Sequence, residues 1–209
     1  LEETLPPSRG PVFALSGPSF AVEVCKHLPT AVVLAGPSGP QASALQSLLM
    51  SPTFRVYLSE DRCGVELGGA LKNVVAVAAG IVDGLGLGHN TRAALITRGL
   101  AEMVRLGTAM GADPRTFAGL SGMGDLVLTC TGALSRNRSV GVQIGQGRKL
   151  ADILAGARTV AEGVGTAKVA LALAERHQVE MPIVREVCAV LFDGKDPKRA
   201  AIDLMERAA

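Results

Sequence analysis

A long apolar segment in the first half of the chain most constrains its fold. From Val65 to Val82 nearly every residue is small and apolar, and Glu66, Lys72 and Asn73 are the residues that interrupt the run. Such a run, with few turn-forming residues, predicts a buried helix. Because Lys72 and Asn73 break it, no uninterrupted stretch reaches the ~18 apolar residues of a membrane span. The segment therefore predicts a core helix, and no transmembrane segment is expected.

Lys72 is the residue of this segment whose burial would cost the most free energy. Burying an ammonium without a partner is strongly unfavourable, so the side chain must pair with an anion, lose its proton or face a cavity. A lysine that extends its amine to the surface from the edge of the helix is the alternative. The adjacent Asn73 and polar residues farther along the chain favour a functional site over that alternative.

The overall composition predicts a globular protein with a sizeable core. Apolar residues make up 48% of the chain and charged residues 19%, with a net charge of +2 and scattered basic residues. These values exclude a disordered chain and give no sign of a nucleic-acid-binding surface. Any basic site should therefore be local and suited to a small anion. The many Ala and Gly residues also allow a homodimer through closely packed helices.

The four cysteines are expected to be reduced core residues of a cytoplasmic protein. Cys25, Cys63, Cys130 and Cys188 form no CxxC pair, and their spacing matches no zinc-binding pattern. We therefore predict neither disulfides nor a metal site. The polar start of the sequence has no signal-peptide pattern, which agrees with a cytoplasmic location.

The order of the predicted elements divides the chain at about residue 61. Short β-branched segments bounded by Gly or Pro predict three strands, with a helix in each of the two connections. The strands are expected at residues 12–16, 30–36 and 53–59. The helices are expected at residues 19–27 and 41–50. A β-α-β-α-β order with short connections predicts the edge of a larger layered α/β sheet. No GxGxxG motif follows a strand here, so the dinucleotide-binding loop is not in this chain.

After residue 61 the patterns predict helices alone. Asn90 is expected to cap a long helix that Gly111 ends, and Asp113 with Pro114 is expected to begin another. A glycine-rich turn is expected at residues 119–125. Further helices are expected from the SRNR segment to about residue 147, and at residues 150–155, 163–177, 182–192 and 197–207. Asp196 is expected to cap the last of them.

Two groups of polar residues lie within or next to the predicted core. The first consists of Lys72 and Asn73. The second consists of Asp125 and Thr129, which share one face of a helix at a spacing of four residues. An ordinary helix N-cap, which contributes about 1 kcal/mol, explains Asp125 at least as well as a role in a site.

Two further polar groups lie at the ends of predicted elements. Ser135, Arg136, Asn137 and Arg138 begin a helix, where backbone N–H groups and a guanidinium suit a phosphate. Taken alone, this segment is more typical of a solvated helix cap. The turn at residues 16–19 follows a strand, and we expect it at the carboxyl edge of the sheet, where ligands of open α/β sheets bind.

Four segments in a fixed order resemble a known family. They are LSGPSFAVEV, the segment with GALKNVVA, the segment with GDLVLTC and SRNRS, and VAEGVGTAKVA. Together they resemble bacterial NAD(P)-dependent glycerol-3-phosphate dehydrogenases from about residue 12 to the C-terminus. The chain lacks that family's opening half-domain, which carries the glycine-rich loop and one further substrate lysine.

The resemblance implies a fold and a division into domains. Residues 1–61 would be the C-terminal part of an NAD(P)-binding Rossmann-type domain. Residues 62–209 would form the all-helical substrate-binding and catalytic domain, of the type at the C-terminus of 6-phosphogluconate dehydrogenase. The fold class expected is thus an α/β remnant followed by an all-α domain.

The resemblance also implies an activity. The family reduces dihydroxyacetone phosphate reversibly to sn-glycerol 3-phosphate with NADPH or NADH, for phospholipid synthesis. Lys72 matches the catalytic lysine, which donates the proton in reduction, and Asp125 matches the acid that orients it. Burial should lower the pKa of the lysine and a nearby carboxylate should raise it, so their balance stays open.

Ligand contacts follow from the same resemblance. The substrate-binding residues expected are Gly17, Ser19, Lys72, Asn73, Asp125, Thr129, Ser135, Arg136 and Asn137. The cofactor-binding residues expected are Ala21, Arg136, Val160 and Glu162. Because the main cofactor loop lies outside this chain, we expect it to be inactive without the missing half.

Two alternative functions stay open. One is a helical domain that binds glycerol phosphate without catalysis, or that pairs with a separate cofactor-binding half. The other is a related dehydrogenase of the 3-hydroxyacid or 6-phosphogluconate type, which also places a lysine and an asparagine on a long helix. The GDLVLTC and SRNR segments argue against the second. A preference for NAD or NADP would be set by residues outside this chain.

Overall fold

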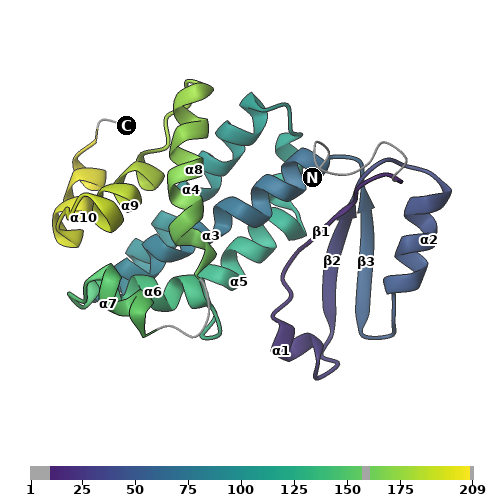
Figure 1. Cartoon of the computed structure of the whole chain (residues 1–209), viewed down its shortest axis with the longest axis horizontal. Helices are drawn as coiled ribbons and strands as arrows, with labels where there is room; N and C mark the ends of the chain where they lie inside the picture. Colours follow the sequence, from purple (N-terminus) through teal and green to yellow (C-terminus); the bar gives the residue numbers. More distant parts are fainter. Residues whose placement is uncertain (1–9, 157–160, 208–209) are drawn as a thin grey trace.

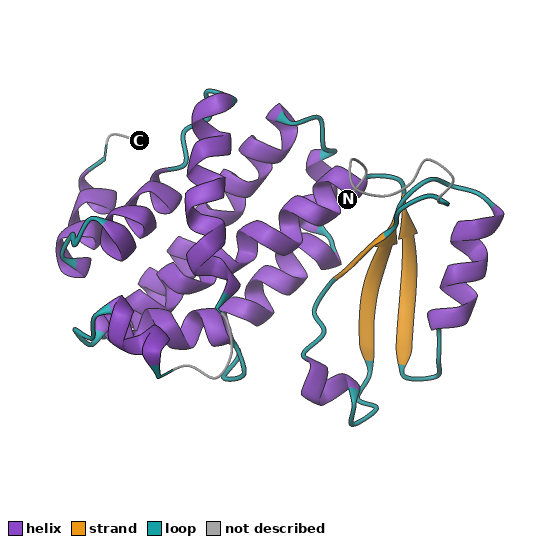
Figure 2. Cartoon of the chain, viewed as in Figure 1, coloured by secondary structure: helices purple, strands orange, loops and turns teal. Residues whose placement is uncertain are grey.

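The computed structural model describes residues 10–156 and 161–207. A small sheet with two helices forms one side of the molecule, and a larger group of helices forms the other (Figures 1 and 2). This arrangement confirms the predicted fold class. The division at residue 61 as a domain boundary stays a prediction, although the helical region begins at Arg62.

The sheet region contains three strands and two helices in alternation. They are β1 (Ala14–Ser16), α1 (Ala21–Val24), β2 (Thr30–Ala35), α2 (Pro40–Leu49) and β3 (Phe54–Ser59). β2 pairs in parallel with β3, from Thr30 opposite Phe54 to Ala35 opposite Ser59. α2 packs on the outer side of this pair, where Val32, Leu34 and Val56 form a small core.

β1 corrects one expectation about the sheet. It pairs antiparallel with β2, with Ser16 opposite Val33. The turn at residues 16–19 therefore runs toward the amino ends of β2 and β3, and the prediction that it lies at their carboxyl edge was wrong. The short predicted strands could not reveal this, because strand direction is set by pairing and not by local pattern.

The predicted core helix is α3 (Arg62–Gly84), and Asp61 caps its N-terminus by accepting the N–H of Gly64 at 2.8 Å. Every residue from Asn73 to Val82 is buried. α4, α5, α6, α8 and α9 all contact this helix, which runs through the group of helices in Figure 1. By length and composition α3 could cross a membrane, but 72% of its most apolar window is buried inside the protein. Its apolar run is thus explained by helices packed around it.

The backbones of α3 and α6 (Arg136–Gly145) are in direct contact. Gly80 and Gly84 on α3 face Gly141 and Gly145 on α6, so each helix carries two glycines four residues apart. A Cβ atom added at Gly141 would fall far inside van der Waals contact with the carbonyl oxygen of Val77. Only glycine therefore permits this approach, which brings the start of α6 beside the middle of α3.

The remaining helices agree closely with the predicted ranges. They are α4 (Gly88–Ala109), α5 (Asp125–Thr131), α7 (Leu150–Ala155), α8 (Glu162–Arg176), α9 (Pro182–Phe192) and α10 (Pro197–Glu206). Two short turns, a 3-10 helix at Pro114–Ala118 and a wide turn at Leu120–Gly124, precede α5. Asp113 and Asp196 cap their helices as predicted, each accepting a backbone N–H at 2.9 Å.

Two local predictions were wrong. Asn90 does not cap α4, because the helix begins at Gly88 and Asn90 lies in its first turn. Cys25 is exposed and not in the core, although all four cysteines are free as expected. The predicted glycine-rich turn before Asp125 is present as a wide helical turn that continues into α5, since Gly68 and Gly122 let it pack tightly against α3 and Phe117.

Candidate active site

The predicted lysine and aspartate meet between two helices. Lys72 on α3 donates a hydrogen bond from Nζ to Oδ2 of Asp125, the first residue of α5. The side chain of Asp125 is 4% exposed and that of Lys72 is 19% exposed. The ammonium thus has a buried counterion on one side and access to solvent on the other. The ion pair with Asp125 thus offsets the free-energy cost of removing the Lys72 ammonium from water.

Asp125 is held by further donors. The Thr129 hydroxyl donates to the backbone carbonyl oxygen of Asp125 at 2.6 Å and lies 3.2 Å from its Oδ1. Burial raises the pKa of the Asp125 carboxyl, while Lys72, Thr129 and the backbone N–H of Gly17 favour its charged form. The N-cap alternative for Asp125 was wrong, because the cap position is Gly124 and the carboxylate binds Lys72.

The turn after β1 reaches this pair from the sheet. Gly17 has φ +145°, a conformation that favours glycine, and a Cβ atom there would lie 2.9 Å from Cα of Val32. Gly17 itself is buried, and its backbone N–H bonds Asp125. Ser19 donates to the carbonyl oxygen of Gly17 at 3.0 Å and is exposed, as is Ala21 at the start of α1.

A chain of amide hydrogen bonds extends the site from Asn73. Asn137 on α6 donates from Nδ2 to Oδ1 of Asn73 at 2.9 Å, and its Oδ1 accepts the backbone N–H of Gly163 at 2.9 Å. Asn73 donates in turn to the carbonyl oxygen of Gly69 at 3.3 Å. Both amides are buried and make most of the bonds they can make. They therefore fix α3, α6 and α8 relative to one another.

Arg136 is the first residue of α6, and its long side chain points outward. Its side chain is 55% exposed, and its Nη2 lies 3.9 Å from Oε1 of Glu162. The other carboxylate oxygen of Glu162, Oε2, lies 3.4 Å from Nδ2 of Asn73. Ser135 is buried and accepts the N–H of Arg138 at 3.2 Å, so its hydroxyl is the helix cap. Val160, the other predicted cofactor contact, lies outside the described residues.

The structure thus joins most of the predicted residues into one continuous set. Gly17, Lys72 and Thr129 surround Asp125, and Asn73 connects Lys72 through Glu162 to Arg136. Ser19 and Ala21 lie on the exposed side of the adjoining turn. The catalytic and binding roles assigned to these residues stay predictions.

Sequence reasoning missed a second group of charges on α3. Asp83 accepts Arg92 Nη1 of α4 at 2.9 Å on one oxygen, and Arg138 Nε and Nη2 of α6 at 2.8 and 2.7 Å on the other. One signal was available in the sequence: Asp83 is the single acidic residue between Glu66 and Glu102. Its partners were not readable, because they come from two other helices.

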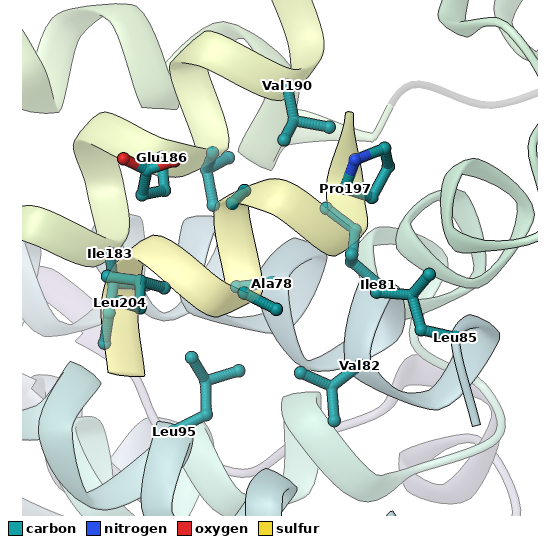
Figure 3. Close-up of a pocket in the computed structure, with 13 residues that line it drawn as sticks. Ala78, Ile81, Val82, Leu85, Leu95, Ile183, Glu186, Val190, Pro197 and Leu204 are labelled. Carbon is teal, nitrogen blue, oxygen red and sulfur yellow. The ribbon is translucent and has the colours of Figure 1, made fainter. Parts of the chain in front are cut away.

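Two pockets lie away from the Lys72–Asp125 pair. An apolar cavity of about 40 Å³ lies between α3, α4, α9 and α10 (Figure 3). It has room for about one water molecule, so it is a packing gap and no metabolite site. Glu186 at its edge pairs with Lys195 at 2.5 Å. A larger surface pocket of about 350 Å³ opens beside Arg136, with Ser139, Gln143 and Arg148 along its wall.

Sequence comparisons give a consistent set of relatives. A sequence model described as the C-terminus of NAD-dependent glycerol-3-phosphate dehydrogenase matches residues 61–202. The glycerol-3-phosphate dehydrogenase (NAD(P)+) of Geobacter sulfurreducens is 63% identical over 204 residues, covering 97% of this chain and 61% of the relative. That of Syntrophotalea carbinolica is 59% identical over 209 residues, covering 100% of this chain and 63% of the relative.

Solved structures agree with the sequence relatives. The glycerol-3-phosphate dehydrogenase of Coxiella burnetii is 45% identical with a TM-score of 0.93, over 95% of this chain and 61% of that one. The enzyme of the same name from Saccharomyces cerevisiae is 29% identical with a TM-score of 0.80, over 93% of this chain and 59% of that one. The chain thus spans about three fifths of the length of the relatives it matches.

Proposed function

The chain belongs to the NAD-dependent glycerol-3-phosphate dehydrogenase family, and from this premise we propose that it carries the substrate-binding and proton-transfer part of that enzyme. The proposed reaction is the reversible reduction of dihydroxyacetone phosphate to sn-glycerol 3-phosphate. Because the chain spans about 61% of its relatives, we infer that the complete reaction needs the part they have in addition. The cytoplasmic location, and a homodimer through the helical region, are part of the same proposal.

One observation carries this proposal: the partly exposed ammonium of Lys72 lies on the buried carboxylate of Asp125, beside the amides that lead to the start of α6. An amine held by a buried acid can give a proton to a carbonyl oxygen and take it back in the reverse direction. The rigid surroundings keep that amine in place, which is what a proton donor of fixed geometry requires.

The chemistry divides between the cofactor and this chain. A bound reduced nicotinamide supplies the hydride that goes to the carbonyl carbon of the substrate. We propose that Lys72 donates a hydrogen bond to the carbonyl oxygen and then the proton that completes the hydroxyl group. Asp125 would remain ionised beside the lysine, and Gly17 and Thr129 would keep the carboxylate oriented by the bonds they make to it.

The phosphate group of the substrate fits the other end of the site. The first N–H groups of a helix have no intrahelical acceptors and carry its partial positive charge, so the start of α6 suits an anion. Arg136 adds a half-exposed guanidinium at that point. Asn137 is already bonded on both sides, so we propose that its side chain shapes this end and that its backbone N–H donates to the phosphate.

The residues that would contact the cofactor fit only part of such a molecule. Arg136 can bind a phosphate oxygen, and the exposed carboxylate of Glu162 can accept from a hydroxyl or amide group. Ala21 offers a small side chain on the exposed side of the turn after β1. We therefore propose that these residues complete an NAD(P)H site whose larger share lies in the part that the relatives have in addition.

Calorimetric titration with sn-glycerol 3-phosphate tests the binding half of this proposal. Lys72→Ala and Arg136→Ala should each weaken binding by tenfold or more, because a charge-assisted hydrogen bond contributes roughly 1.5–3 kcal/mol. The exposed Lys198 is a matched control, and Lys198→Ala should bind as the wild-type chain does. Equal affinity in all four proteins would contradict both site assignments.

Enzyme assays test the catalytic half. The 209-residue chain should not reduce dihydroxyacetone phosphate with NADPH, whereas the protein extended by the missing part should. In that extended protein, Lys72→Met should lower kcat by about 10²–10⁴-fold, the usual contribution of a general acid. A normal rate from the short chain, or from the Lys72→Met variant, would overturn the proposal.

A further inference from the structure

The ion cluster around Asp83 lies at the C-terminal end of α3, about three turns beyond Lys72 in the middle of the helix. Its three members come from three helices, α3, α4 and α6, and their side chains are 15–24% exposed. One carboxylate binds two guanidiniums through both of its oxygens. Such a multidentate, partly buried arrangement fixes geometry far better than an exposed ion pair does.

This cluster is connected to the start of α6 through Arg138. The Arg138 side chain binds Asp83, its backbone N–H bonds the Ser135 cap, and its backbone lies directly against Gly80 of α3. The first turn of α6 is therefore held at the side by Asp83 and at the end by Ser135. Asn137 adds a third attachment through Asn73.

The two arginines of the SRNR segment thus differ in what they touch. Arg136 is 55% exposed, and its nearest acid is 3.9 Å away. Arg138 is 24% exposed and makes two bonds of 2.7–2.8 Å to a partly buried carboxylate. Arg136 is free to meet a ligand, whereas Arg138 is committed within the protein.

We propose that Asp83, with Arg92 and Arg138, is a positioning residue that holds the first turn of α6 in the orientation that binds the phosphate group of the substrate. The inference rests on the function proposed above for α6. Without Asp83 the two guanidiniums lose their shared acceptor and repel each other, so Arg138 and the turn that contains it shift away from α3. The N–H groups of that turn and Arg136 would then no longer converge on one point.

Calorimetry with sn-glycerol 3-phosphate and with inorganic phosphate tests the inference, at a temperature where circular dichroism shows each variant folded. Asp83→Asn and Arg138→Met should weaken the binding of both ligands by a similar factor, about tenfold or more. The reason is that sn-glycerol 3-phosphate and inorganic phosphate each present a phosphate group to the first turn of α6. Arg138→Lys keeps a cation that can reach Asp83 and should recover part of that loss.

Asp203→Asn is the matched control. Asp203 also bonds two cations, Lys195 at 2.7 Å and Arg199 at 2.8 Å, but it lies on α10 and anchors only the C-terminal helices. This variant should bind both ligands with wild-type affinity. A similar loss in Asp203→Asn and Asp83→Asn would show a general effect of destabilisation and would overturn the inference.

Hydrogen exchange gives a readout that needs no ligand. In Asp83→Asn the amides of residues 138–141 should exchange faster, while those of α9 keep their protection. Unchanged exchange in α6, or wild-type affinity in Asp83→Asn, overturns the inference alone. A wild-type chain that binds neither phosphate compound overturns the proposed function and this inference with it.

Discussion

The helical region and the sheet region of this chain are stabilised very differently. The helical region contains one large continuous core, in which side chains such as Phe117, Met103 and Leu106 are fully buried. The core of the sheet region consists of Val32, Leu34 and Val56 with a few partly buried neighbours. Among the described residues, every buried polar or charged side chain lies in the helical region.

The exposed residues show the same contrast. Seven large apolar side chains of the sheet region are exposed: Leu15, Val22, Leu28, Leu48, Leu49, Tyr57 and Leu58. A three-stranded sheet with one covering helix buries too little apolar surface to be stable alone. The relatives are longer than this chain, so we propose that their additional part covers these side chains. The helical region therefore supplies most of the stability, and the sheet region depends on neighbouring elements.

The contact between α3 and α6 gives the largest effect expected. Gly141→Val should destabilise the chain by about 4 kcal/mol, because a side chain there overlaps the backbone of α3 and forces the helices apart. Urea unfolding followed by circular dichroism measures this. Gly165 on α8 has open space around it, so Gly165→Ala should instead stabilise by about 0.5–1 kcal/mol. A tolerated Gly141→Val would show that the close helix contact is not required.

Glu102 makes the stability of the helical region depend on pH. It is 2% exposed and accepts the N–H groups of Ile183 and Val184 at 2.7 and 3.3 Å, which caps α9 from α4. Burial raises the pKa of Glu102 to about 7, against the effect of these donors and of Arg105 and Arg98. A raised carboxyl pKa favours the protonated folded state, so this contribution is present below pH 4.5 and is lost as pH rises through about 7.

Comparing wild type with Glu102→Gln isolates that contribution. The difference between the two free energies of unfolding should change by up to about 3 kcal/mol between pH 4 and pH 8, in favour of wild type at the acid end. Urea unfolding at a series of pH values provides the measurement. A difference that stays constant with pH would mean that Glu102 has an ordinary pKa in the folded state.

A matched pair of core truncations compares the two regions directly. Val77 on α3 and Val56 on β3 are 0% and 1% exposed. Val77→Ala should lower the global free energy of unfolding by about 2 kcal/mol, since it leaves a cavity in the large core. Val56→Ala should mainly increase hydrogen exchange in β2 and β3, because that region can open by itself. Equal global effects would mean that sheet and helices unfold as one unit.

The smallest effect is expected on the open side of the sheet. Tyr57 is 49% exposed and contacts the Arg55 guanidinium at 5.7 Å from the ring centre. Tyr57→Ser should change the stability of this chain by less than about 0.5 kcal/mol in thermal unfolding. In the longer protein the same substitution should cost more if the additional part covers the ring. A large effect already in the short chain would show that this face is covered by another copy.

Local signals in the sequence predicted many of these features. The apolar run predicted α3, and Asp113, Ser135 and Asp196 stand where helix caps were expected. These signals succeed because capping and helical periodicity involve residues within one or two turns of each other. They fail where a distant element decides, as for β1, whose direction depends on its pairing with β2. They also fail for Asn90, because no side chain caps the N-terminus of α4.

Residue types and their spacing were enough to predict an energetically unfavourable lysine inside an apolar helix, three strands before a helical region, and residues suited to a phosphate. The packing of distant elements was needed to find that Asp125 is the partner of Lys72, that Arg136 faces outward while Arg138 binds Asp83, and that Glu102 caps α9. The reason is physical: the position of a residue along the chain fixes its chemistry and local conformation, but the charge or donor that compensates for its burial comes from another element.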